Sequence, residues 1–190
     1  YGLVGSEMCI RDRFMLPFFS YVFPHTAKNL ETYRYRMLEA AKANAAKNGY
    51  QGAQYPWESA DDGTEQCPDW TIEPDGTCYR CYVAVYEHHV TAAVAYGIYN
   101  YVRITHDTEF LLHKGAEILI ETARFWKSRL QYIKENDRYE IHRVTGPDEW
   151  HEPVDNNVYT NYLARWNLRY VTALTEMLSR EYPQEYTALV

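Results

Sequence analysis

Apolar residues recur at helical spacing in four stretches of the chain, and this pattern predicts a helix in each. Thr26 and Asp107 are candidate N-caps, and Asn48-Gly49 suits the end of a helix. The second stretch carries few charges on any side, which predicts a buried helix. The third has a candidate break at Lys114–Gly115. The four stretches are 26–49, 82–104, 107–130 and a last one that starts near Asp155 or Asn156.

Two long polar stretches separate these helices and show no sustained period. Residues 50–80 hold most of the glycine, proline, aspartate and tryptophan between helices, and residues 134–155 hold one strand-like run, 138–144. Long ordered loops of this kind often carry function. The element order predicts an all-α fold in which buried inner helices alternate with amphipathic outer ones, as in an (α/α)6 toroid of helical hairpins. Four or five helices cannot close such a ring, so we expect an incomplete toroid fragment with long functional loops.

Composition narrows the class of partner. The net charge of −7 disfavours nucleic acid and anionic membranes, because both require clustered Lys and Arg. The chain has no apolar run long enough to span a bilayer and no basic region followed by a long apolar core, so we expect a cytoplasmic protein. Small neutral ligands or proteins remain as partners. Aromatic residues make up 16% of the chain and suit either a core or the flat faces of sugars.

The two ends of the chain differ from its middle. Residues 1–13 show no helical or strand pattern and resemble the in-frame translation of a sequencing adapter, so we expect them to be non-native. A genuine ragged N-terminus is the alternative. Residues 14–190 then form the partial catalytic domain, and the segment from Pro183 reads as the beginning of a further helix that is cut short.

Acidic residues crowd residues 145–157, beside a tryptophan. Mutual repulsion near an aromatic ring raises at least one carboxyl pKa, which is what a general acid needs near neutral pH. Two other interpretations stay open: a solvated loop in which Asp155 caps the following helix, and a weak calcium site. The chemistry-bearing side chains here are Asp148, Glu149, Trp150, His151, Glu152 and Asp155.

Trp57 and Glu58 follow a proline in the first long loop. A tryptophan face can stack on a pyranose while a neighbouring carboxylate accepts hydrogen bonds from its hydroxyls. A buried tryptophan beside a capping glutamate would give the same local pattern.

Three cysteines and two histidines form a weak zinc pattern. Their spacing contains one Cys-x-x-Cys pair, but the other ligands are not at the spacing that a zinc site requires. Free thiols are therefore the preferred interpretation. His88 or His89 is a candidate pocket residue, although a helical histidine is more often part of a core. We find no glycine-rich phosphate cradle, no Gly-x-Ser-x-Gly elbow and no Cys/His nucleophile pair. The cysteines are Cys67, Cys78 and Cys81.

Several segments together resemble glycoside hydrolase family 65. The resemblance runs in order from Phe14 to about Tyr170 and implies a piece of an (α/α)6 toroid. It implies an inverting phosphorylase of α-linked glucose disaccharides such as maltose, trehalose, kojibiose or nigerose, or one of a smaller set of hydrolases. The matching segments are Phe14-Met-Leu-Pro-Phe18, Tyr33-Arg-Tyr-Arg36, Gly52-Ala-Gln-Tyr-Pro-Trp-Glu-Ser59, Glu121-Thr-Ala-Arg-Phe-Trp126, Thr145-Gly-Pro-Asp-Glu-Trp-His-Glu152 and Asp155-Asn-Asn-Val-Tyr-Thr-Asn161.

The resemblance implies a role for each candidate site residue. Glu149 is the general acid, and Trp57 and Glu58 hold the non-reducing glucose. His151, Asn156 and Asn157 flank the acid and shape the acceptor side. The reaction needs inorganic phosphate as co-substrate, no metal and no other cofactor, and a complete protein of this family is commonly a homodimer.

Two departures from the family pattern leave the reaction open. The Trp-Asp pair expected just before Phe14 is replaced by Arg11-Asp12-Arg13, and Asp12 is not its equivalent. The residues expected to bind phosphate lie beyond Val190. A same-family hydrolase, trehalase-like, and a catalytically dead helical sugar-binding protein are therefore the alternatives, and the isolated chain is expected to be inactive and poorly folded.

Overall fold

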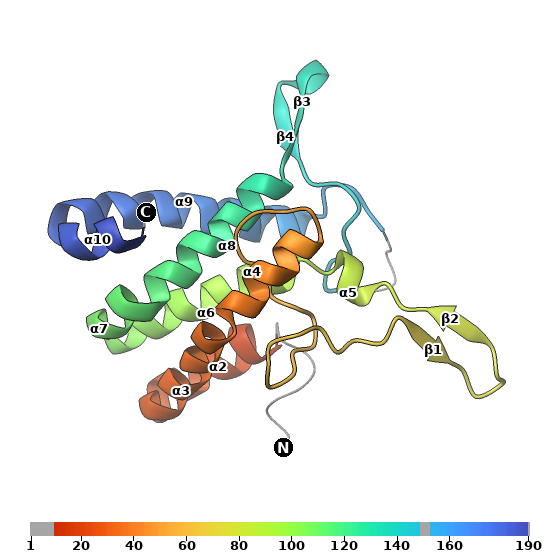
Figure 1. Cartoon of the computed structure of the whole chain (residues 1–190), viewed down its shortest axis with the longest axis horizontal. Coiled ribbons are helices and arrows are strands. Elements are labelled where there is room, and N and C mark those ends of the chain that lie inside the picture. The colour runs from red at the N-terminus through yellow and green to blue at the C-terminus, as the bar shows by residue number, and fades with distance from the viewer. Residues whose placement is uncertain (1–9, 149–152, 190) are drawn as a thin grey trace.

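The computed structural model describes residues 10–148 and 153–189, and its described part is mostly helical (Figure 1). Strands occur there only in two short antiparallel hairpins. The all-α prediction is therefore confirmed. The elements are α2 (Leu16–Val22), α3 (Pro24–Arg36), α4 (Leu38–Lys47), β1 (Trp70–Ile72), β2 (Cys78–Arg80), α5 (Val83–Tyr86), α6 (His89–Thr105), α7 (Thr108–Phe110), α8 (Ala116–Arg129), β3 (Gln131–Ile133), β4 (Arg138–Glu140), α9 (Val158–Glu181) and α10 (Pro183–Leu189), with π-helical turns at Arg11–Met15 and Leu111–Gly115 and a 3-10 turn at Lys134–Asn136.

Helix α6 forms the centre of the molecule and contacts α2, α3, α8 and α9. Most of its residues are buried, as the nearly charge-free sequence predicts. Along the chain, α2, α6 and α9 alternate with α3/α4, α8 and α10. Helices α2 and α9 both contact α6, and these three form the inner layer. Helix α8 contacts α4 as well as α6 and α9, and it belongs to the outer layer of the helical hairpins. This is the expected incomplete toroid.

Two of the predicted helices are each divided in two, which corrects the sequence-based boundaries. The helix expected over 26–49 begins at Pro24, whose fixed φ suits a first turn, so Thr26 lies inside it and is not its N-cap. The helix is interrupted at Met37, between α3 and α4. The helix expected over 82–104 is interrupted at Glu87, where ψ is 61° and the backbone leaves the helical region. The apolar period does not reveal either interruption of the helix, because a single non-helical residue hardly shifts the pattern on its two sides.

Two later helices, α7 and α9, are each capped by the side chain just before them, and the sequence predicted one of these two caps. The Asp107 side chain accepts a hydrogen bond from the Phe110 N–H at 2.9 Å, which confirms it as an N-cap. At the candidate break around Gly115 the helix continues through a π-helical turn. Helix α9 is capped by Asn157, whose side chain accepts from the Thr160 N–H at 3.0 Å. The alternative in which Asp155 caps this helix is therefore wrong.

Both hairpins lie at one end of the helical layers. Figure 1 shows β1–β2 and β3–β4 projecting from the end at which α6 and α9 begin. Residues 48–69 lead into β1, and residues 153–157 lead into α9. Of the strand-like run 138–144, only Arg138–Glu140 pairs with β3, and Val144 instead forms an isolated antiparallel bridge with Val154. The fold thus brings the two segments with candidate chemistry to a common end.

The described part of the first thirteen residues packs into this fold. Arg11 and Asp12 are buried, and the Asp12 carboxylate accepts hydrogen bonds from the Arg34 guanidinium, one of them from Nε at 3.3 Å. The non-native origin of residues 1–13 stays a prediction. No helix in residues 10–148 and 153–189 is long and apolar enough to cross a membrane.

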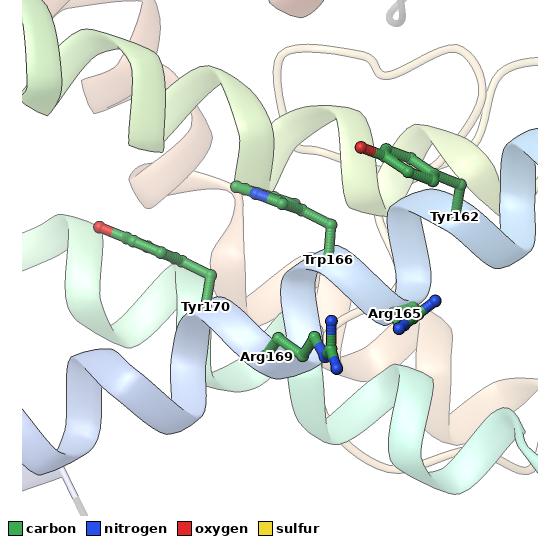
Figure 2. A pocket seen from close by; sticks show the side chains of 5 residues that line it. All are labelled: Tyr162, Arg165, Trp166, Arg169 and Tyr170. Carbon is green, nitrogen blue, oxygen red and sulfur yellow. The ribbon is translucent and has the colours of Figure 1, made fainter.

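Large aromatic side chains are left uncovered at both edges of the inner layer. Phe14 is 69% and Tyr21 is 70% exposed on one edge, and Tyr162 is 70% exposed on α9 at the other. Five side chains of α9 line a hollow of about 390 Å³. Figure 2 shows that Tyr162, Trp166 and Tyr170 project to one side of α9 and Arg165 and Arg169 to another. Apolar surfaces of this kind normally pack against further protein.

This chain produced alone is therefore expected to fold poorly. Thermal denaturation followed by near-UV circular dichroism should show no cooperative transition, and a dye that binds exposed apolar surface should fluoresce strongly. A sharp melting transition together with glucosyl turnover would contradict this expectation.

Candidate active site

The first loop is fastened tightly to the helices before it reaches Trp57. The Ala53 N–H donates to the Glu121 carbonyl of α8 at 2.9 Å, and the Gln54 N–H donates to the Ala41 carbonyl of α4 at 3.0 Å. The Tyr55 N–H then donates to the Thr91 hydroxyl of α6 at 3.0 Å. Three successive residues of the loop thus bind three different helices. These hydrogen bonds place Trp57 near the start of α6.

Gly52 allows this close approach. Its φ is +72°, and a Cβ at this position would lie 2.5 Å from the Phe125 backbone nitrogen and closer still to the Glu121 carbonyl oxygen. A left-handed backbone conformation against neighbouring main chain requires glycine. The segment that carries Trp57 and Glu58 therefore depends on this residue.

A single carboxylate holds the backbone of Trp57 and Glu58. Glu65 accepts hydrogen bonds from the Trp57 N–H at 2.7 Å, the Glu58 N–H at 2.9 Å and the Cys67 N–H at 3.0 Å. The Gln66 N–H returns a bond to the Glu58 carbonyl at 2.8 Å. Sequence reasoning missed Glu65, because its partners are backbone amides that no side-chain pattern reveals. Trp57 and Glu58 are both half-buried, so each keeps a face open to a ligand.

His89 connects the two loops at the start of α6. Its ring is fully buried and makes edge contacts with the rings of Trp57, at 6.1 Å between centroids, and of Tyr159, at 5.5 Å. Nδ1 lies 3.3 Å from the Thr145 carbonyl, and Nε2 lies 3.6 Å from the buried Glu87 carboxylate. Burial lowers the pKa of His89 to about 4, so the ring is neutral at pH 7. His89 thus joins Trp57 to the beginning of the acidic loop.

His88 belongs to the core instead. The Arg129 Nε donates to His88 Nδ1 at 3.1 Å, so Nε2 carries the proton and donates to the Val85 carbonyl at 3.0 Å. Burial, with help from the neighbouring Arg129 charge, lowers the pKa of His88 to about 3. Of the two histidines considered from the sequence, His89 is the one that meets the candidate site.

Four groups of hydrogen bonds hold the residues on either side of the acidic loop, three between main-chain atoms and one to a side chain. Val144 and Val154 exchange two backbone hydrogen bonds of 2.9 Å, and the Thr145 N–H donates to the Tyr86 carbonyl at 3.0 Å. The Arg143 N–H donates to the Asp155 carboxylate at 2.8 Å. The Asn156 N–H donates to the Ile141 carbonyl at 2.8 Å. Glu149 and His151 lie in the segment between these anchors, outside the described residues.

Asn156 and Asn157 both use their side chains to hold this base. The Asn156 Oδ1 accepts from the Ile141 N–H at 3.1 Å, and φ is +56° at this residue. The Asn157 side chain caps α9 and lies so close to Gly146 that a Cβ there would be 2.5 Å from its Nδ2. A contribution of either residue to a sugar site stays a prediction.

Metal ligation has little support in the described part of the chain. No group of three or more His, Cys, Asp or Glu side chains there is arranged to hold a metal ion. The three described cysteines are free, and only Cys67 and Cys81 approach each other.

Comparisons with known proteins agree on one family. Residues 9–188 match the model of the glycosyl hydrolase family 65 central catalytic domain. A kojibiose phosphorylase of Thermoanaerobacter brockii is 56% identical over 188 residues, which cover 99% of this chain and 24% of that protein. A kojibiose hydrolase of Flavobacterium johnsoniae is 40% identical over 190 residues, which cover 99% of this chain and 26% of that protein.

A solved structure shows the same fold. It belongs to a protein from the human microbiome that is assigned as a kojibiose phosphorylase, with a TM-score of 0.83 and 27% sequence identity. The match covers 97% of this chain and 25% of that one. The chain therefore spans about a quarter of the length of the relatives it matches.

Proposed function

Because this chain belongs to glycosyl hydrolase family 65, we propose that the complete protein is an inverting phosphorylase of α-linked glucose disaccharides, and that kojibiose is the first substrate to test. The observation that carries this proposal is the 56% identity with a kojibiose phosphorylase over nearly the whole chain. The reaction would convert disaccharide and phosphate into β-glucose 1-phosphate and a free sugar.

The proposed mechanism assigns two tasks to the two loops. The face of Trp57 stacks on the non-reducing glucose, and the Glu58 carboxylate accepts hydrogen bonds from its hydroxyls. Glu149 gives its proton to the glycosidic oxygen as the bond to the anomeric carbon breaks. Inorganic phosphate attacks that carbon from the opposite face and inverts it. Phosphate is itself an anionic nucleophile, so no second catalytic carboxylate is required.

Contacts in the described residues support this division. His89 touches Trp57 on one side and the Thr145 carbonyl on the other, so the sugar-holding loop and the acid-bearing loop meet at one buried ring. In the proposal Asn156 and Asn157 act by holding the base of the acid loop, and His151 faces the acceptor sugar. The proposal uses phosphate as co-substrate and no bound cofactor, and it keeps a cytoplasmic location and a homodimer as predictions.

The test is breakdown of a panel of α-linked diglucosides by the complete protein, with and without inorganic phosphate. Phosphate-dependent release of β-glucose 1-phosphate from kojibiose is the expected result. Release of two free hexoses without phosphate would identify a hydrolase instead. The 40% identity with a kojibiose hydrolase is the observation that favours this alternative. No breakdown of any member of the panel would favour the sugar-binding protein without catalysis.

Replacing Glu65 by glutamine should weaken sugar binding more than it slows turnover. Glutamine keeps one acceptor oxygen, but its amide nitrogen cannot accept, so at least one of the hydrogen bonds from Trp57, Glu58 and Cys67 is lost. Loss of one bond to a charged group costs about 1.5–3 kcal/mol, so KM for the disaccharide should rise by about tenfold or more. Steady-state kinetics on the complete protein measures this.

Glu73→Gln is the matched control for that variant. Glu73 is exposed at the turn of the β1–β2 hairpin, where its backbone makes the hydrogen bonds to Gly76 and Thr77. This control should keep the original KM. If Glu65→Gln folds normally and also keeps it, the assignment of Glu65 as a positioning residue is wrong.

A further inference from the structure

Two thiols face each other at the base of the β1–β2 hairpin. The sulfur atoms of Cys67 and Cys81 are 3.6 Å apart, and both residues are half-buried. Trp70 pairs with Arg80 in the hairpin, and the Cys81 N–H donates to the Asp69 carbonyl at 2.8 Å, which extends the pairing toward Cys67. A disulfide bond is about 2.05 Å long, so an approach of about 1.5 Å would join the two sulfurs.

We propose that Cys67 and Cys81 form a reversible disulfide site, closed by a small-molecule disulfide such as oxidised glutathione, and that the bond holds in place the loop carrying Trp57 and Glu58. Cys78 has no part in it. It lies exposed on β2, opposite Ile72. With no three-ligand metal cluster among the described residues, the close sulfur pair is better explained as a dithiol than as part of a zinc site.

The site is linked to the first loop through one carboxylate. The Cys67 N–H donates to Glu65 Oε1 at 3.0 Å, and the same carboxylate holds the Trp57 and Glu58 N–H groups at 2.7 and 2.9 Å. A covalent bond at Cys67 limits how far its backbone can move. Because the Cys67 N–H and the two loop amides share Glu65, the bond also limits motion of residues 57 and 58.

The chemistry balances as thiol–disulfide exchange. Burial, and then the adjacent Cys81 sulfur, raise the pKa of the Cys67 thiol. The exchange begins when one of the two thiols, here Cys81, gives its proton to solvent. The Cys81 thiolate attacks one sulfur of oxidised glutathione and releases one glutathione thiolate. Cys67 then gives its proton to solvent and attacks the Cys81 sulfur, which releases the second glutathione. Two protein thiols lose two electrons, and one glutathione disulfide gains them.

The first test is peptide mapping of the complete protein after exposure to oxidised glutathione and alkylation of the remaining thiols. Trypsin cuts after Lys47, Arg80 and Arg103, so Cys67 and Cys78 fall in residues 48–80 and Cys81 falls in residues 81–103. We expect a cross-linked pair of these two peptides that dithiothreitol separates. The Cys78→Ser variant should keep the cross-link, and Cys67→Ser and Cys81→Ser should each lose it.

A cross-link that disappears in Cys78→Ser, or glutathione attached to Cys81 with no cross-link, would overturn the site. The effect on the loop is tested by hydrogen exchange of the amides in residues 57–67. Exchange should be slower in the oxidised protein than in the reduced one, and it should not respond to oxidant in the Cys67→Ser/Cys81→Ser double variant. Equal exchange in the oxidised and reduced protein would refute the coupling. Neither readout uses enzyme activity, so both are independent of the proposed reaction.

Discussion

Replacing Glu149 by glutamine in the complete protein is expected to reduce kcat by a factor of about 10²–10⁴, since this is what a positioned general acid contributes to a rate and the amide cannot donate a proton of comparable acidity. Glutamine has nearly the shape of glutamate, so sugar binding should be retained. The comparison of kcat with the Kd of the disaccharide, measured by calorimetry, separates these two effects.

A substrate that needs no acid distinguishes proton donation from a structural role. Fluoride leaves without strong protonation, so α-glucosyl fluoride should react with the Glu149→Gln variant at a rate much closer to that of the unmodified protein. Glu152→Gln removes a carboxylate from the same crowded loop and should keep most of the activity toward disaccharides. Full activity of Glu149→Gln toward the disaccharide would show that the acid lies elsewhere.

Replacing Gly52 by alanine should destabilise the protein strongly and displace the sugar-binding segment. The left-handed conformation costs an alanine about 1 kcal/mol, and a Cβ pressed into the backbone of α8 adds about 1–3 kcal/mol or more. The expected loss is therefore about 3 kcal/mol in the free energy of unfolding. Denaturation by urea or heat, followed by tryptophan fluorescence, measures it.

Gly49→Ala provides a control that separates the two causes. Gly49 has a similar φ, +81°, but a Cβ there would meet no atom within 4 Å. This variant should lose only the conformational part, about 1 kcal/mol. If both variants lose the same stability, the close approach of the first loop to α8 is not what makes glycine necessary at position 52.

Local signals in the sequence predicted most of the helical structure. Asp107 was identifiable as an N-cap because the cap and the amide it binds are three residues apart. The nearly charge-free stretch around Ala92 and Ala95 predicted a buried helix, and α6 is buried. The breaks at Met37 and Glu87 were missed, since one non-helical residue leaves the apolar period on either side almost unchanged.

The candidate site was predictable only in part. Trp57 stood out in the sequence by its type and by its neighbours, and the resemblance to the family supplied its role. Glu65 was not predicted, because it acts through backbone amides. The alternative in which Asp155 caps a helix was wrong, because Asp155 binds the Arg143 N–H twelve residues earlier in the chain. The predicted role of Glu149 concerns a position outside the described residues and stays a prediction.

The sequence by itself determined the helical periods, the Asp107 cap and the family, because each of these depends on residues that are near neighbours or lie in contiguous segments. Only the tertiary structure decided that His89 touches both Trp57 and the Thr145 carbonyl, that Glu65 holds the first loop, and that the sulfurs of Cys67 and Cys81 meet. Such contacts join positions that are far apart or irregularly spaced along the chain. They form only when the packing of α6 against its neighbouring helices sets where each loop starts and ends.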